Sequence, residues 1–143
     1  MGSIVWDQET AEVYDATYAY ESVPSVVDPM VDLLMEFAGG GPVLEFAVGT
    51  GRIALPLSAR GVPVYGIELS PHMVEQLQRK PGAEAIAVVI GDMAKERLSG
   101  SFELVYVVAN SIMNLTTQEE QLGVFENAAA HLAPGGHFVV ELI

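Results

Sequence analysis

The chain has 143 residues, half of them hydrophobic, a length and composition that suit one domain with a well-buried core. Six basic residues against nineteen acidic ones give a formal charge of -13, which repels nucleic-acid backbones and anionic lipid, so neither is an expected partner. The sequence contains no cysteine, which excludes disulfides and thiolate metal sites and fits a reducing compartment, with the cytoplasm as the default expectation.

The first 42 residues are predicted to form a helical segment in front of the main fold. Tyrosines mixed with acids over 7–21 indicate a short helix or a lid. Pro24 opens a second helix with apolar residues at three- and four-residue steps, and the glycines and proline of 39–42 end it. No basic stretch followed by an apolar run opens the chain, and no apolar run is long enough to span a bilayer, so we expect neither a leader nor a membrane span.

Strands and helices are predicted to alternate over residues 43–143. Apolar runs predict strands at 43–47, 63–69, 86–90, 104–109 and 137–142. Helices are expected at 53–60, 71–80 and 117–132, the last with a capping box at its start. The continuous apolar run 86–90 is typical of a strand buried on both faces, and 134–136 is expected to be a turn. This alternation predicts an α/β fold, with a mostly parallel sheet and helices on both faces.

A glycine turn follows the first predicted strand, at the sheet edge where such folds bind ligands. Gly49 and Gly51 allow a tight turn and a close approach of the backbone to a ligand. Dehydrogenases, methyltransferases and purely structural turns share this pattern. Ala54 replaces the third glycine usual in dinucleotide binding, and Glu45 would repel a pyrophosphate but suits an ammonium group. No Gly-Lys-Ser/Thr follows, which disfavours a nucleoside-triphosphate loop.

Acids stand at the end of the second predicted strand and just after the third. Glu68 stands at the spacing from the glycine turn that a ribose-binding acid requires. Asp92 directly follows the third strand, where a carboxylate can bond an adenine amino group and the thioether of Met93 can pack on the ring. Each acid alone fits an exposed charge or a turn equally well.

Taken together and in this order, the motifs resemble those of class I S-adenosylmethionine-dependent methyltransferases over roughly Val43 to the end. The matching elements are Glu45-x-x-x-Gly49-x-Gly51, Glu68, Gly91-Asp92 and Leu132-x-Pro134-Gly135-Gly136. The resemblance implies a Rossmann-like three-layer sandwich with five strands present. It also implies transfer of a methyl group from S-adenosylmethionine to a small-molecule acceptor by in-line displacement, leaving S-adenosylhomocysteine.

The resemblance also implies roles for individual residues. Glu45 and the 49–51 backbone would hold the methionine part of the cofactor, Glu68 the ribose, and Asp92 with Met93 the adenine. Arg52 either pairs with the cofactor carboxylate or is a charge on the helix surface. The expected cofactor-binding residues are Tyr14, Tyr18, Glu45, Ala47, Gly49, Thr50, Gly51, Arg52, Glu68, Leu69, Met73, Asp92, Met93 and Asn110.

The sequence indicates less clearly which residues lie next to the transferred methyl group. Tyr14 and Tyr18 either close over the cofactor or pack on a helix face. Asn110 and Ser111 follow the fourth predicted strand, a position that in similar enzymes borders the sulfonium and the methyl acceptor, although a polar loop cap fits as well. No catalytic base is assigned; Asn110 and Glu141 are the catalytic candidates, no metal is expected, and the three histidines, His72, His131 and His137, are expected to be structural or exposed.

The sequence stops in the fifth predicted strand, whereas similar methyltransferases continue with two more strands. We therefore expect one domain over 1–143, truncated at its C-terminus, with a lid and first helix at 1–42 and a cofactor-binding core at 43–143. An open sheet edge favours a homodimer. Two alternatives remain: a non-catalytic S-adenosylmethionine-binding fragment or assembly module, and a nicotinamide-dependent oxidoreductase, which gives no use to Glu45 or Asp92.

Overall fold

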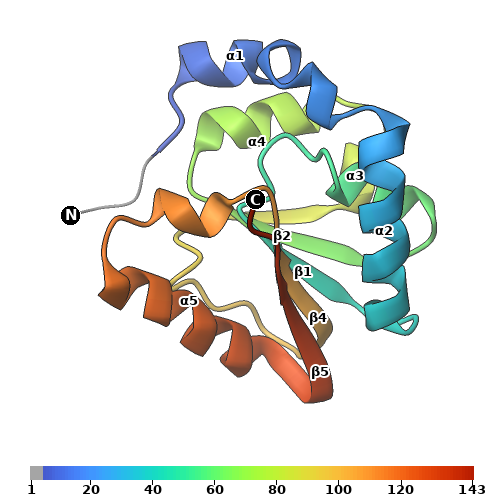
Figure 1. Ribbon diagram of the computed structural model, residues 1–143, viewed down its shortest axis with the longest axis vertical. Coiled ribbons are helices and arrows are strands. Elements are labelled where there is room, and N and C mark those ends of the chain that lie inside the picture. The colour runs from blue at the N-terminus through green and yellow to red at the C-terminus, as the bar shows by residue number, and fades with distance from the viewer. Residues whose placement is uncertain (1–4) are drawn as a thin grey trace.

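A five-stranded parallel sheet forms the centre of the computed structural model, which describes residues 5–143 (Figure 1). The strand order is β3-β2-β1-β4-β5, and every neighbouring pair is parallel. The strands are β1 (Val43–Phe46), β2 (Val64–Glu68), β3 (Ala87–Ile90), β4 (Phe102–Val107) and β5 (Leu132–Val140). The predicted Rossmann-like α/β fold is confirmed, and the sheet that was expected to be mostly parallel is parallel throughout the described strands.

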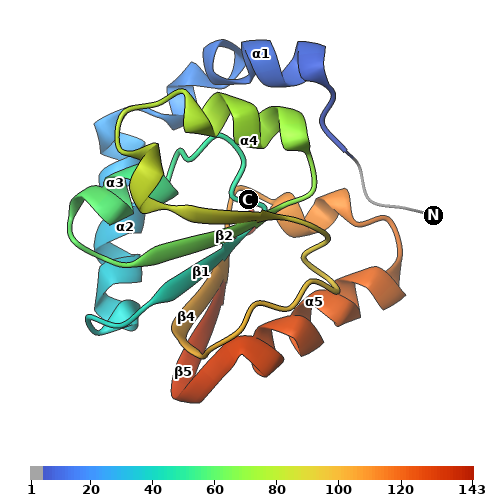
Figure 2. The ribbon, with the colours of Figure 1, turned by 180° about the vertical axis from the view of Figure 1, so that it is seen from behind.

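Helices cover both faces of this sheet (Figures 1 and 2). The helices are α1 (Gln8–Thr17), α2 (Pro24–Ala38), α3 (Ala54–Ala59), α4 (Pro71–Gln78) and α5 (Gln118–His131), with 3-10 turns at Ala19–Glu21, Ala83–Ala85 and Ser111–Asn114. Helices α2, α3 and α4 bury one face, and α5 buries the other. Alternate strand residues therefore enter different cores: Val43 packs with α2, and Leu44 packs with α5. Helix α1 lies over α4, above the carboxyl ends of the strands (Figure 1).

The predicted helix ends follow local signals. Ser70 caps α4 by accepting a hydrogen bond from the Met73 N–H at 3.3 Å. Thr117 caps α5 in the same way from the Glu120 N–H at 3.1 Å. Helix α2 ends at Gly39, whose φ of 58° is the left-handed conformation that glycine adopts without strain. None of the helices within residues 5–143 has the length and apolar character needed to cross a membrane.

Strand β3 differs from the prediction. A strand buried on both faces was expected there, and that expectation is wrong. β3 lies at the edge of the sheet, pairs only with β2, and leaves Ile90 52% exposed. Its apolar run is continuous, but the link from β3 to β4 is a loop over residues 91–101 instead of a covering helix. Apolar sequence alone therefore did not distinguish an edge strand from a central one.

Strand β5 also differs from the prediction. The turn expected at 134–136 lies inside the strand as a bulge, because residues 133–136 fall between the pairs Phe102–Leu132 and Leu104–His137. The left-handed φ of 82° at Gly135 accommodates the extra residues. The strand ends at Val140, two residues earlier than expected. β5 forms the second edge of the described sheet, and self-association through it stays a prediction.

Candidate functional site

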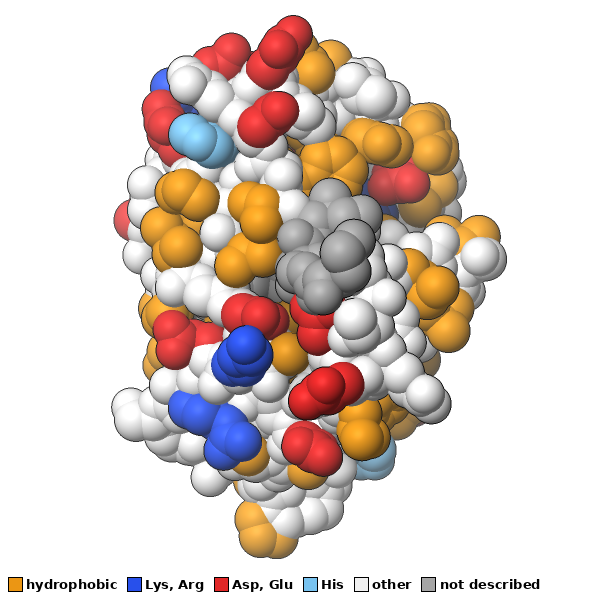
Figure 3. Space-filling model, turned by 90° about the vertical axis from the view of Figure 1, so that its left-hand side faces the viewer, with side chains coloured by type: hydrophobic (Ala, Val, Ile, Leu, Met, Phe, Trp, Pro, Cys, Tyr) orange, Lys and Arg blue, Asp and Glu red, His pale blue; other side chains and the backbone are white. Residues whose placement is uncertain are grey.

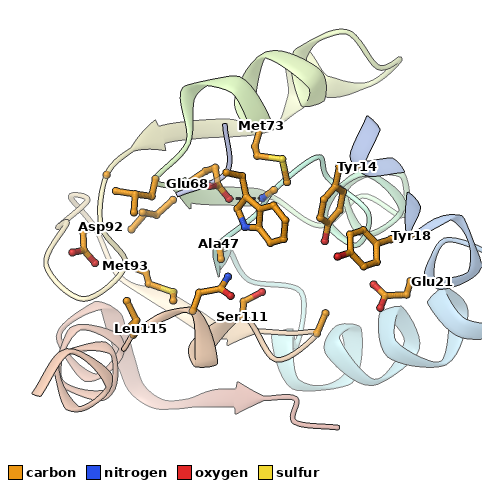
Figure 4. A pocket seen from close by; sticks show the side chains of 17 residues that line it. Tyr14, Tyr18, Glu21, Ala47, Glu68, Met73, Asp92, Met93, Ser111 and Leu115 are labelled. Atoms are coloured by element: carbon orange, nitrogen blue, oxygen red, sulfur yellow. Dashed lines mark hydrogen bonds between the residues drawn. The ribbon is translucent and has the colours of Figure 1, made fainter. Parts of the chain in front are cut away.

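A cleft opens at the carboxyl ends of the strands, beneath α1 (Figure 4). Its volume is about 840 Å³ including the space open to solvent. A smaller hollow of about 320 Å³ adjoins it beside the glycine turn. Nine predicted cofactor residues line the main cleft: Tyr14, Tyr18, Ala47, Gly49, Glu68, Leu69, Met73, Asp92 and Met93. The hollow adds three more: Glu45, Thr50 and Arg52.

Glu68 is held at the cleft by the backbone around it. Its two carboxylate oxygens accept hydrogen bonds from the N–H groups of Gly49 and Ser70, each at 2.9 Å. The side chain is 5% exposed, and burial raises the pKa of Glu68 while these backbone bonds act in the opposite direction. Because each carboxylate oxygen has two lone pairs, both oxygens can still accept a hydroxyl donor from the cleft.

Glu45 lies on the other side of the glycine turn, deeper in the sheet. Its side chain is 2% exposed, and its Oε1 accepts a hydrogen bond from the Tyr106 hydroxyl at 2.9 Å. Burial raises the pKa of Glu45 to about 8, although the Tyr106 hydroxyl and the Arg52 guanidinium both favour the charged form. A buried carboxylate with one hydroxyl partner is poised to receive a cationic group.

Tyr106 is a residue that the sequence did not single out. It is fully buried on β4 and stands directly beside Glu45 of β1 in the parallel ladder. Its burial raises the pKa of the Tyr106 hydroxyl well above the usual value, which keeps it a hydrogen-bond donor. Only the register of the sheet shows that the two residues are neighbours.

Asp92 and Met93 lie at one end of the cleft, and Tyr14, Tyr18 and Glu21 lie at the other (Figure 4). The Asp92 carboxylate accepts from the Ala94 N–H at 2.8 Å, which fixes the start of the loop after β3. Among the described residues, no group of three or more histidine or acidic side chains is arranged to hold a metal ion. The site is therefore an elongated cleft with acids along its length.

The N-terminal segment closes the cleft from above. Trp6 and the two predicted lid tyrosines all line it, and their rings contact one another: centroids lie 5.4 Å apart for Trp6 and Tyr14, and 4.7 Å apart for Tyr14 and Tyr18. Burial raises the pKa of Tyr14 to about 12, so its hydroxyl stays protonated. Trp6 was missed because it precedes any periodic segment. The Ser70 hydroxyl bonds the carbonyl of Trp6.

Polar contacts fasten this lid to the glycine turn. The Thr50 hydroxyl donates to Asp15 of α1 at 2.6 Å, and Lys80 contacts the other Asp15 oxygen at 2.8 Å. Lys80 also donates to the Thr50 carbonyl at 2.7 Å. The Arg52 guanidinium donates to the Glu21 carbonyl at 2.8 Å, so Arg52 is not a free charge on the helix surface. The turn and the lid are thus one connected structure.

Three predicted residues are not among those that line the described cleft or hollow. The Asn110 side chain accepts from the Ile143 N–H, and that of Glu141 accepts from the Ala109 N–H, each at 2.7 Å. Left-handed backbone at Ala109 and Asn110 turns the Asn110 side chain toward the chain end, while Ser111 lines the cleft. The third residue is Gly51, where the packing of the neighbouring side chains leaves no room for a Cβ.

Gly51 and Gly61 form a matched pair that tests this packing role. Both have left-handed φ values, 86° and 88°, but a Cβ at Gly51 would overlap Leu77 and approach Leu55 at 3.0 Å, whereas nothing lies near one at Gly61. Gly61→Ala is expected to cost about 1–2 kcal/mol through the backbone alone. Gly51→Ala is expected to cost about 1–3 kcal/mol more through overpacking. Urea denaturation of both variants measures the difference; equal losses would contradict this role for Gly51.

Comparisons with known proteins agree with the fold. A family model described as a methyltransferase domain matches residues 43–136, and the chain belongs to this family of methyltransferases. Cypemycin N-terminal methyltransferase from a Streptomyces species is 28% identical over 87% of this chain and 54% of its own length. The dTDP-4-amino-2,3,4,6-tetradeoxy-D-glucose N,N-dimethyltransferase of Saccharopolyspora spinosa is 28% identical over 97% and 56%. The chain thus spans about half the length of these curated relatives.

Solved structures give the same result. DesVI of Streptomyces venezuelae superimposes with a TM-score of 0.78 at 27% identity, over 94% of this chain and 58% of DesVI. The glycopeptide N-methyltransferase MtfA, in complex with S-adenosylmethionine, superimposes with a TM-score of 0.71 at 28% identity, over 78% and 48%. The predicted family is confirmed, and S-adenosylmethionine is its cofactor. A nicotinamide cofactor gains no support from these comparisons.

Proposed function

We propose that the protein binds S-adenosylmethionine in this cleft and transfers its methyl group to an amine of a small molecule. The observation that carries the proposal is the pair of buried carboxylates, Glu45 and Glu68, on either side of the glycine turn. One faces a hollow suited to an ammonium group, and the other has acceptor positions suited to a diol. In S-adenosylmethionine, the methionine part carries an ammonium group and the adjoining ribose carries a diol. These two groups match Glu45 and Glu68 in the same order.

The remaining cleft residues fit the rest of the cofactor. Asp92 supplies an acceptor for the adenine amino group, and the side chains of Met73 and Met93 supply apolar surface for the ring. Arg52 lines the same hollow as Glu45 and would pair with the cofactor carboxylate. Gly49 has a left-handed φ of 60°, which glycine adopts without strain, and its lack of a side chain would let the backbone approach the ligand closely.

The methyl donor would supply a methyl carbon on a sulfonium. The nitrogen of a neutral amine attacks this carbon in line and displaces the sulfur, so that the C–N bond forms as the C–S bond breaks and S-adenosylhomocysteine leaves. The protein's part is to hold both groups in line and to exclude water, which the aromatic lid of Tyr14 and Tyr18 does. Glu21, at the same end of the cleft, attracts the cationic amine. Only the neutral amine can attack, so a substrate that arrives as an ammonium first loses one proton to solvent, and the methylated product forms as an ammonium.

An amine acceptor is supported by the relatives and by charge. Among the relatives, one is named as an N-terminal methyltransferase, one as an amino-sugar N,N-dimethyltransferase and one as a glycopeptide N-methyltransferase. Acidic side chains, with some basic ones among them, are spread over the face seen in Figure 3, and the net charge of -13 favours approach of a cation. The same charge disfavours nucleic acid and anionic membranes as partners. Dimerisation through β5 and a cytoplasmic location stay predictions.

Trp6 provides the test, because it is the single tryptophan of the sequence and lines the cleft. S-adenosylhomocysteine is expected to change its fluorescence in a saturable way, and NADH is not. A Trp6→Phe variant, which loses the signal, should retain the calorimetric affinity within a few-fold. Transfer of labelled methyl groups to amino sugars or peptide N-termini then tests turnover. Binding without transfer to any amine would favour a non-catalytic binding module, and saturable binding of NADH alone would overturn the proposal.

A further inference from the structure

One face of α5 is built to hold the loop that follows β3. Gly123, Asn127 and His131 stand four residues apart, so they share that face. The face lies against residues 93–98 of the loop between β3 and β4 (Figure 2). Asp92 and Met93, which line the cleft, belong to the same loop. The side of the loop away from the cleft therefore meets a row of specific side chains.

Asn127 makes the central contact. Its side chain is fully buried, and its amide nitrogen donates to two loop carbonyls, those of Met93 at 2.9 Å and Glu96 at 2.8 Å. Its amide oxygen is buried without a partner among the described residues. A buried acceptor without a partner is unfavourable, so an asparagine that only filled space here would destabilise the fold. Its two donated hydrogen bonds to the loop offset that cost.

His131 holds the next part of the loop. It is 1% exposed, its Nε2 accepts from the Leu98 N–H at 2.9 Å, and its Nδ1 lies 2.8 Å from the Asn127 carbonyl. A backbone N–H only donates and a carbonyl only accepts, so these partners select the neutral ring with hydrogen on Nδ1. Gly123 completes the row, because a Cβ there would lie 3.3 Å from the Cβ and the carbonyl oxygen of Ala94.

Met93 links this row to the cleft. Its side chain lines the cleft while its carbonyl is held by Asn127. Asp92, one residue earlier, bonds the Ala94 N–H, and its own carbonyl accepts from Lys95 and Glu96. The loop is thus a compact turn with its ligand-facing side chains on one side and its anchors on the other. A shift of the anchored carbonyls would move Asp92 and Met93 together.

We propose that Asn127 and His131 are positioning residues that set the adenine specificity of the site by fixing the loop that carries Asp92. This inference rests on the proposed function, because it requires that Asp92 faces the adenine amino group. Loss of the anchors should then reduce discrimination at the adenine ring, while contacts at Glu68 and Glu45, on strands β2 and β1, remain. A purely structural role for α5 would lower stability without changing that discrimination.

The test compares calorimetric affinities for S-adenosylhomocysteine and S-inosylhomocysteine, which differ in the amino group that Asp92 would bind. Wild-type protein is expected to prefer the adenine form by about tenfold or more. In Asn127→Leu, the preference is expected to fall to about threefold or less. His131→Leu should behave like Asn127→Leu, and His131→Gln, which restores an acceptor for the Leu98 N–H, should recover the preference. Circular dichroism confirms that each variant is folded.

The outcomes distinguish a failure of the positioning role from a failure of the proposed function. An undiminished preference in folded Asn127→Leu overturns the positioning role and leaves the proposed function intact. If that variant does not fold, an unchanged preference in His131→Leu overturns the role instead. Wild-type protein that binds neither ligand overturns the proposed function, and the positioning role with it.

Discussion

Replacing Glu68 with glutamine is expected to weaken S-adenosylhomocysteine binding by about 10- to 100-fold, the effect of losing a hydrogen bond to a charged group. Both Glu68 oxygens already accept from backbone N–H groups, those of Gly49 and Ser70. A glutamine amide has a single acceptor oxygen, so its NH₂ group would face one of these donors and could not accept from a ribose hydroxyl. Isothermal titration calorimetry at pH 7.5 measures the change.

The matched control is Glu75→Gln, which makes the same change of charge on α4. Glu75 is an exposed residue that pairs with Arg79 at 2.6 Å, on the surface. Such exposed pairs contribute little, so the control is expected to bind the ligand within about twofold of wild type. Equal affinities for Glu68→Gln and Glu75→Gln would remove Glu68 from the ribose site.

The second large effect is a pH dependence that arises from Glu45. Its pKa in the empty protein is about 8, and the cofactor ammonium is expected to lower it in the complex. Below pH 8, Glu45 must therefore lose a proton when the ligand binds. Affinity for S-adenosylhomocysteine should fall about tenfold per unit as the pH decreases from about 7.5 to about 5.5, until the pKa of the complex is reached. Calorimetry in two buffers of different ionisation enthalpy should detect the released proton.

Two variants separate Glu45 from other titrating groups. Glu45→Gln should bind more weakly at pH 7.5 and lose the steep pH dependence. Tyr106→Phe removes the hydroxyl that favours the charged form, so the pKa of Glu45 should rise and the loss of affinity should begin at higher pH. The same slope in Glu45→Gln as in wild type would contradict the assignment.

The same carboxylate affects the stability of the empty protein. The folded-state pKa of Glu45 lies above its usual 4.5, so between pH 4.5 and 8 the folded chain holds a proton that the unfolded chain releases. The contribution of Glu45 to the free energy of unfolding therefore decreases as the pH rises through that window. Glu45→Gln should accordingly melt at a higher temperature than wild type at pH 8, consistent with a binding group that costs stability.

Much of the site could be predicted because its signals are local. The apolar run 43–47 and the glycines after it mark a strand and a tight turn without knowledge of the rest of the fold. Glu68 is the last residue of β2 and Asp92 lies two residues after β3, and parallel strands bring their carboxyl ends to one edge. Position at the carboxyl end of a strand was therefore sufficient to predict that these acids share a cleft.

The remaining features depend on contacts between distant segments. Tyr106 lies 61 residues from Glu45 in the sequence, and only the β1–β4 register makes them partners. Trp6 reaches the cleft because α1 folds over α4, for which no sequence periodicity gives a signal. Asn110 and Ser111 were expected to lie near the reaction because they follow the predicted strand 104–109; Ser111 lines the cleft, but the left-handed backbone of Asn110 turns its side chain away.

A structure of the protein with S-adenosylhomocysteine is the most direct test of the proposed site. The ribose hydroxyls should lie at about 2.6–3.0 Å from the Glu68 carboxylate, the range of strong O–H···O bonds. The ammonium group should lie beside Glu45, and the adenine between Met73 and Met93 with its amino group toward Asp92. A ligand bound outside this cleft, or inside it with no contact to Glu68, would contradict the proposed function.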